Sequence, residues 1–208
     1  MLRLMKKEID LEGSPVMYDE CVSGEMLARD WDIHNGEWWA EDGWINGRNR
    51  ENAPSMIVSK KDFIGNVMVS FEARTVLPST HDIDFMWNGC WDEAQNARGM
   101  AYVAGLEGWW EGKVGFEKSP DYALNVATQL FTFVPGQTYQ IAGGSVDGHC
   151  FVLIDGVLAL EITDPDPIDA MQFARVGFEA YCSHIQIRNI QVRQLRWTEL
   201  EQRYAQEF

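Results

Sequence analysis

The sequence predicts an all-β fold, a two-sheet antiparallel jelly-roll sandwich with a short C-terminal helix. Stretches of alternating apolar and polar residues recur along the chain. Asp-Gly and Asn-Gly dipeptides, which are typical of hairpin turns, separate several of them. Neither strand–helix–strand alternation nor an internal repeat is present, which favours a sandwich. At 208 residues we expect a single domain spanning 1–208, long enough to bury roughly 70% of its unfolded surface.

The first half of the chain begins with predicted turns and continues with two clear strands. The expected turns are Asn35-Gly36, Asp42-Gly43 and Asn46-Gly47. Residues 56–63 read as a strand and a turn, and residues 65–76 alternate along a longer strand. In that longer strand, one face is expected to carry Val67, Val69, Phe71 and Ala73, and the other Met68, Ser70, Glu72 and Arg74.

The second half reads as five more strands. Residues 137–164 predict three strands joined at Asp147-Gly148 and Asp155-Gly156, and residues 174–195 predict a further hairpin. In "IQIRNIQV", residues 185–192, Ile185 and Ile187 occupy odd positions, whereas Ile190 and Val192 occupy even positions. If all four point to the core, one extra residue lies between them, which predicts a β-bulge at Arg188–Asn189.

A helix is expected over about residues 197–207. Thr198 can cap it, with Glu201 at the capping-box spacing. Leu200 and Tyr204 would form an apolar stripe on one face.

Charge and composition exclude several classes of partner. The formal net charge of −15 disfavours nucleic acid and anionic membrane surfaces, and leaves a neutral ligand, a cationic ligand or a protein partner. No stretch is apolar enough for a membrane helix, and the N-terminus lacks the apolar run of a signal peptide. The four cysteines are scattered without a C-x-x-C pair, which is typical of a reduced, cytoplasmic protein. The oligomeric state is left open.

Three segments resemble a known group of proteins. The segments "GEWWAEDGWING", "FIGNVMVSFEAR" and "VGFEA" followed by "IQIRNIQV" resemble concanavalin A-like jelly rolls of the 3-keto-disaccharide hydrolase type, and the related small jelly rolls of rhamnogalacturonan and pectin utilisation loci. The resemblance spans roughly residues 30–195 and implies a lectin/glucanase-type sandwich that binds a carbohydrate on its concave sheet face. Its closing motif matches Arg188, Asn189 and Ile190, which we interpret as structural.

The stretch "HDIDFMWNGCW" supplies the first candidate site. If Ile83, Phe85 and Trp87 point to the core, the opposite face carries Asp82, Asp84, Met86 and Asn88, joined by Glu72 and Arg74 if the two strands are neighbours. We expect Glu72, Asp82 and Asp84 to be exposed on that face. Strand residues two apart are about 6.6 Å apart, within the roughly 6.5–9.5 Å of inverting glycosidases. We therefore take Glu72, Asp82 and Asp84 as candidate catalytic acids, with Arg74 and Asn88 as ligand contacts. The alternative is a solvated face neutralised by Arg74.

"GLEGWWEGKVGFEKSPDY" supplies the second candidate site. Trp109 and Trp110 lie between glycines, so they suit stacking on a sugar ring, or else one of them anchors a loop in the core. Glu117 is a fourth candidate catalytic acid and Asp121 a further ligand contact. Trp91 and Arg98, in the connection "NGCWDEAQNARG", are expected at the rim.

The sequence predicts no cofactor. Asp164, Asp166 and Asp169 could bind Ca²⁺, but two prolines and the missing EF-hand pattern favour a rigid turn. The four histidines lack the spacing of a zinc site, and no P-loop, dinucleotide or nucleophile-elbow motif is present.

Three functions remain open from the sequence. The first is an enzyme that cleaves a glycoside by hydrolysis or elimination, with the carboxylates as acid and base. The second is a non-catalytic sugar-binding protein. The third is a structural or accessory subunit, in which the nine tryptophans would anchor an interface.

Overall fold

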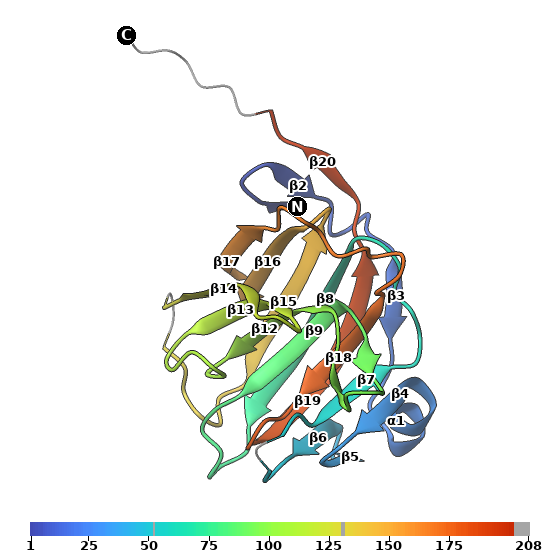
Figure 1. Cartoon of the computed structure of the whole chain (residues 1–208), viewed down its shortest axis with the longest axis vertical. Coiled ribbons are helices and arrows are strands. Elements are labelled where there is room, and N and C mark those ends of the chain that lie inside the picture. The colour runs from blue at the N-terminus through green and yellow to red at the C-terminus, as the bar shows by residue number, and fades with distance from the viewer. Residues whose placement is uncertain (52, 130–131, 202–208) are drawn as a thin grey trace.

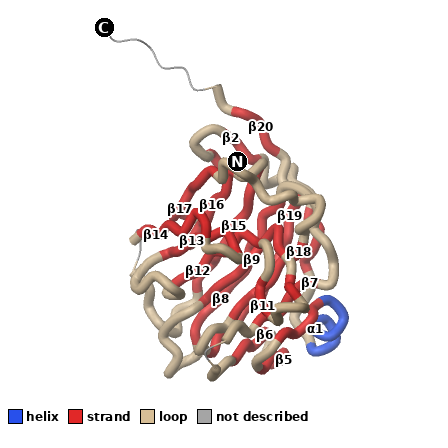
Figure 2. Tube along the Cα trace, viewed as in Figure 1, coloured by secondary structure: helices blue, strands red, loops and turns tan. Residues whose placement is uncertain are grey.

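The chain forms a sandwich of two large antiparallel sheets, as Figures 1 and 2 show. This computed structural model describes residues 1–51, 53–129 and 132–201. The predicted all-β sandwich is confirmed. The seven-stranded sheet contains, in order, β14 (Ala123–Thr128), β13 (Val114–Ser119), β12 (Ala101–Leu106), β9 (Ile83–Gly89), β18 (Arg175–Glu179), β7 (Met56–Ser59) and β4 (Trp31–His34).

The second large sheet has eight strands, and two small sheets accompany the sandwich. The eight-stranded sheet contains, in order, β17 (Val157–Thr163), β16 (His149–Ile154), β15 (Tyr139–Val146), β8 (Val67–Thr75), β19 (His184–Gln194), β6 (Trp44–Arg48) and β5 (Glu37–Glu41), with β3 (Val16–Asp19) paired to β19. The small sheets are β1 (Leu2–Arg3), β2 (Lys7–Ile9) and β20 (Trp197–Glu199), and the pair β10 (Trp91–Asp92) and β11 (Ala97–Arg98).

The main core lies between the two large sheets. On β8, the four residues predicted to share the inward face are buried in it, and so are Ile83, Phe85 and Trp87 of β9. The Phe71 ring lies 5.0 Å from that of Phe85 and 4.8 Å from that of Phe178, both edge-on, so aromatic contacts join the two sheets. The predicted alternation of β8 and β9 is therefore confirmed.

The hairpin dipeptides were correctly predicted in three places. Asp42-Gly43 joins β5 to β6, Asp147-Gly148 joins β15 to β16, and Asp155-Gly156 joins β16 to β17, each with positive φ at both residues. Asn35-Gly36 also turns with positive φ, but it connects β4 to β5, which belong to different sheets.

The predicted turn at Asn46-Gly47 is wrong, because both residues lie inside β6. Gly47 is needed there for close packing rather than for a turn. A Cβ on Gly47 would lie 2.4 Å from carbons of the Trp38 ring, whose Nε1 donates a 3.0 Å hydrogen bond to Ser55 Oγ.

We expect Gly47→Ala to reduce the free energy of unfolding by about 1–3 kcal/mol, the usual cost of overpacking a buried site. The added methyl group must displace a ring that is 8% exposed and hydrogen-bonded. Urea denaturation followed by tryptophan fluorescence measures the change. Gly24→Ala is the matched control, because a Cβ on Gly24 meets no atom within 4 Å. Equal stability of the two variants would contradict the packing role of Gly47.

The expected hairpin over 174–195 is also wrong. β18 and β19 follow each other in sequence but belong to different sheets, so the connection crosses the sandwich. Alternation is the same for a hairpin and for such a crossing, so the pattern could not separate them. The predicted bulge is confirmed. Arg188 pairs with Glu72 and Gln191 with Ser70, so the two β19 residues between them lie opposite a single residue of β8, Phe71.

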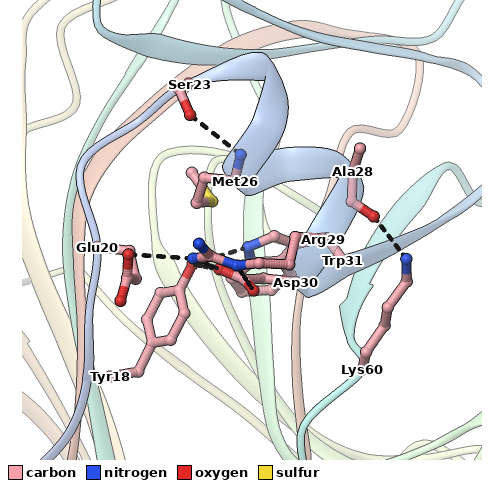
Figure 3. A network of polar contacts seen from close by, with 9 residues as sticks. All are labelled: Tyr18, Glu20, Ser23, Met26, Ala28, Arg29, Asp30, Trp31 and Lys60. Atoms are coloured by element: carbon pink, nitrogen blue, oxygen red, sulfur yellow. Dashed lines mark hydrogen bonds and ion pairs between the residues drawn. The ribbon is translucent and has the colours of Figure 1, made fainter.

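The helices differ from the prediction. Trp197–Glu199 form strand β20, paired with Lys7–Ile9, so the expected helix does not begin there; residues 202–207 of that prediction lie outside the described residues. Helix α1 (Gly24–Asp30), which the sequence analysis missed, begins where Ser23 Oγ accepts a hydrogen bond from Met26 N–H at 3.0 Å (Figure 3).

Hydrogen bonds attach α1 to the strands around it. In Figure 3, the Tyr18 hydroxyl of β3 donates to Asp30 at 3.0 Å, and Arg29 reaches Asp30 and Glu20. Lys60 Nζ donates to the Ala28 carbonyl oxygen at 2.6 Å, near the helix end. Among the described residues, no helix is long and apolar enough to cross a membrane.

Candidate functional site

A pocket of about 580 Å³ opens on the outer face of the seven-stranded sheet. Asp84, Glu117 and Glu179 reach it from β9, β13 and β18, because each follows or precedes a buried phenylalanine on its strand and so points away from the core. We call it the Arg98 pocket. It is lined by Pro54, His81, Asp82, Asp84, Ala97, Arg98, Gly108, Trp109, Glu117, Ser119, Pro120, Tyr122, Glu179, Tyr181 and Cys182.

Strand register brings the acids together. Asp84 of β9 lies opposite Glu179 of β18 on one side and Gly105 of β12 on the other. Glycine at 105 leaves room for the carboxylate, because a Cβ there would lie 1.6 Å from Asp84 Oδ1. A Cβ on Gly108 would lie 2.9 Å from that oxygen and 3.1 Å from Asp82 Oδ1, so both aspartates converge beside Gly108.

Asp82 and Asp84 form a buried carboxyl pair, 4% and 5% exposed. Asp82 has a positive φ of 75° and accepts a 2.6 Å hydrogen bond from Tyr181 N–H. Burial, with the charge of Glu179, raises the pKa of Asp82 to about 7. Burial, with the charges of Asp82 and Glu179, holds the pKa of Asp84 well above its usual range. At neutral pH the pair therefore retains a proton.

Arg98 of β11 is the positive charge at the centre of the site. Its guanidinium contacts Glu117 Oε1 at 2.5 Å, forms an ion pair with Glu179, and donates to Ser119 Oγ at 3.3 Å. Burial raises the pKa of Glu117 even though the charge of Arg98 opposes the shift. Arg98 therefore joins acids from two strands, β13 and β18, that are not neighbours.

Two buried acceptor oxygens in the pocket have no partner. Among the described residues, Asp84 Oδ1 and Glu117 Oε2 lack a hydrogen bond, although their residues are 5% and 1% exposed. Leaving such oxygens unsatisfied costs about 1–3 kcal/mol each, or more when they are charged. A ligand with hydrogen-bond donors would satisfy both.

Aromatic side chains complete the pocket wall. Trp109 lies against Gly115, where a Cβ would come within 2.9 Å of its ring, and its Nε1 donates to Asn125 Oδ1 at 3.2 Å. Tyr122 is exposed at the pocket mouth, and Tyr181 follows β18. The wall thus offers flat apolar surfaces next to a polar floor.

The structure brings together five of the predicted site residues and separates the others. Those in the Arg98 pocket are Asp82, Asp84, Arg98, Trp109 and Glu117. The prediction that the two aspartates are exposed is wrong, because strand β12 and the loop containing Gly108 lie against them.

The predicted positions of Glu72 and Arg74 beside these acids are wrong. Both lie on β8, on the outer face of the other sheet. Glu72 pairs with Arg188 at 2.7 Å, and the Arg74 guanidinium stacks 4.4 Å from the Trp44 ring. β8 pairs with β15 and β19 rather than with β9, so shared parity does not place their outward side chains on one surface.

Four other predicted ligand contacts lie outside the pocket lining. Asn88 sits at a register shift of β9 with a φ of 43°, so its side chain bonds Ser145 and the Gly65 carbonyl oxygen instead. Trp91 stacks on His34 at 4.4 Å. Trp110 donates to Asn125 at 2.7 Å, and Asp121 is exposed in the turn after β13.

Among the lining residues that the sequence analysis missed are His81, Ser119, Tyr122, Glu179 and Tyr181. A signal for Glu179 was present, because it has opposite parity to Val176 and Phe178, the same argument that selected Glu117. The tyrosines carried no comparable signal, since they lie outside the strands.

The acidic turn at 164–169 is held by protein contacts. Asp164 accepts from the Tyr102 hydroxyl at 2.9 Å and pairs with Lys118 at 2.9 Å, while Asp169 accepts from Met171 N–H at 2.9 Å. Within residues 1–51, 53–129 and 132–201, no three acidic, histidine or cysteine side chains are grouped so as to hold a metal ion. This includes the acids of the Arg98 pocket.

Similarity to known proteins is found at the level of the fold. No family model and no curated protein matches the chain. A carbohydrate-binding module, CBM66, from Bacillus subtilis is 14% identical with a TM-score of 0.62, covering 79% of this chain and 96% of that one. A protein of unknown function with a galectin-like fold, also from Bacillus subtilis, is 12% identical with a TM-score of 0.65, covering 86% and 96%. The carbohydrate recognition domain of Emp47p is 12% identical with a TM-score of 0.55, covering 79% and 88%. The chain thus has the jelly-roll fold.

Proposed function

We propose that the protein binds a carbohydrate or glycoside in the Arg98 pocket. The observation that carries this proposal is the pair of buried, unpartnered acceptors, Asp84 Oδ1 and Glu117 Oε2, that line it. Sugar hydroxyl groups are donors that can reach such oxygens, and hydrogen bonds to charged groups contribute roughly 1.5–3 kcal/mol each.

The shape and the wall of the pocket support this ligand class. A volume of about 580 Å³ is within the range of small-molecule sites. Trp109 supplies an aromatic surface against which the apolar face of a sugar ring can stack. The jelly-roll fold shared with a carbohydrate-binding module and a carbohydrate recognition domain is consistent with the proposal.

Binding is tested with a panel of plant and bacterial oligosaccharides, followed by isothermal titration calorimetry. We expect Asp84→Asn to weaken binding of the best ligand about tenfold, because the amide replaces one of the two acceptor oxygens with a hydrogen-bond donor. Glu72→Gln is the matched control: it removes a carboxylate from the other sheet and should leave the affinity unchanged. Absence of any binding glycan, or equal effects of both variants, would contradict the proposal.

A second candidate function is cleavage of the bound glycoside by hydrolysis or elimination. The raised pKa of about 7 at Asp82 favours it, since a general acid must be protonated at neutral pH. Outside the aspartate pair, the pocket lining contains two further carboxyl groups, and both contact Arg98. The second acid or base would therefore be Glu117 or Glu179. Release of new reducing ends or of an unsaturated product from a bound oligosaccharide tests this function; binding without either product favours a non-catalytic module.

A further inference from the structure

We infer that the Arg98 pocket selects a sugar that carries a protonated amine, such as an amino sugar, and rejects acidic sugars. This inference rests on the proposed function and names its ligand class. Two observations carry it: the excess of carboxyl groups over cations that line the pocket, and the two unpartnered carboxylate oxygens at its floor.

The charge balance of the lining is negative. Its acids are Asp82, Asp84, Glu117 and Glu179, and among the described lining residues Arg98 is the single lysine or arginine. Arg98 is already engaged by Glu117 and Glu179. If Asp82 and Asp84 share one proton, three negative charges still face one guanidinium. An ammonium group reduces this excess, whereas a uronate, sulfate or phosphate group increases it.

The geometry suits a compact donor. Asp84 Oδ1 and Asp82 Oδ1 lie 2.9 and 3.1 Å from the position of a Cβ on Gly108, where the absence of a side chain leaves space. An ammonium has three donors and no acceptor, so it can satisfy convergent carboxylate oxygens that a single hydroxyl group serves only in part. The Trp109 ring lines the same pocket, and aromatic faces attract cations when they are partly desolvated.

The test compares oligosaccharides that share a β-1,4-glucan backbone and differ at one ring position. Cello-oligosaccharides carry a hydroxyl group there, chito-oligosaccharides an N-acetyl group and chitosan oligosaccharides a primary amine; oligogalacturonates, which have a different, α-1,4-linked backbone, supply an acidic sugar outside this matched set. Calorimetry near neutral pH keeps part of the amine protonated without fully protonating the Asp82–Asp84 pair. We expect the amine to bind at least tenfold more tightly than both neutral forms, with a preference that falls as salt is added, and we expect no binding of the oligogalacturonate.

A variant of the pocket shows whether Asp84 produces the preference, and three other outcomes would contradict either this inference or the proposed function. Asp84→Asn should reduce the preference for the amine over the hydroxyl form, while Glu72→Gln should leave it unchanged. Equal binding of the neutral and amine forms, or tight binding of the uronate, overturns this inference but leaves carbohydrate binding intact. Competition of calcium chloride with the amine would identify a metal site and also overturn the inference. Failure of every oligosaccharide to bind counts against the proposed function itself.

Discussion

Arg98→Met is expected to lower the free energy of unfolding by about 3–5 kcal/mol, because it removes one partner from a buried ion-pair network. The Arg98 side chain is 13% exposed, and its two glutamate partners, Glu117 and Glu179, are 1% and 6% exposed. Without the guanidinium these carboxylates remain buried without a counter-charge. Urea denaturation monitored by circular dichroism measures the loss.

Two comparisons separate this charge effect from lost packing. Arg29→Met removes the ion pairs of an arginine that is 60% exposed, so its cost should be much smaller than that of Arg98→Met. Adding Glu117→Gln and Glu179→Gln to Arg98→Met should restore part of the lost stability. A loss no larger than that of Arg29→Met, or no recovery in the triple variant, would show that Arg98 is not the electrostatic centre of the site.

Asp82→Asn is expected to make the protein more stable than the wild type above about pH 7, by a few kcal/mol. Since the pKa of Asp82 is raised from 3.8 to about 7, protonated Asp82 favours the folded state; this stability is fully present below about pH 3.8 and is lost as the pH rises from there to about 7. The groups that face it are Asp84, Glu179, Arg98 and the Tyr181 N–H. Asparagine keeps an acceptor for that N–H and cannot ionise.

The measurement is the melting temperature of both proteins across the range from about pH 3 to about pH 8. The two curves should lie close together at the acidic end and separate as the pH rises. Glu72→Gln supplies a control of opposite sign. Burial raises the pKa of Glu72, but hydrogen bonds from Arg188 and Asn189 outweigh it and lower the pKa. That variant should therefore be less stable than the wild type at neutral pH and approach it as the pH falls below about 4.5. A pH-independent difference for Asp82→Asn would contradict its raised pKa.

Periodicity found most strands but could not assign them to sheets. The alternation of β8 and β9 correctly separated inward from outward residues, because the period of a strand is a local property of the backbone. It did not show that these strands belong to opposite sheets, so Glu72 and Arg74 were placed beside Asp82. For the same reason, the sequence predicted a hairpin where the chain in fact crosses from β18 in one sheet to β19 in the other.

Helix-capping patterns in the sequence did not predict correctly where the chain forms a helix. The capping-box spacing at Thr198 predicted a helix, but backbone pairing with β2 makes Trp197–Glu199 a strand. Ser23 caps α1, but the helix is seven residues long, which left little periodicity to detect. Strand pairing and tertiary packing decided both cases.

The sequence by itself determined the all-β sandwich, the inward faces of its long strands, the bulge near Asn189, and the importance of Asp82, Asp84, Glu117, Arg98 and Trp109 as residues to inspect. Only the tertiary structure decided that these five share one pocket, that Glu179 and two tyrosines join them, and that the aspartates are buried and share a proton. The physical reason is that alternation depends on neighbours along the chain. The pocket instead depends on which strands pair, where a positive φ at Asp82 turns a side chain, and where Gly105 and Gly108 leave room for carboxylates.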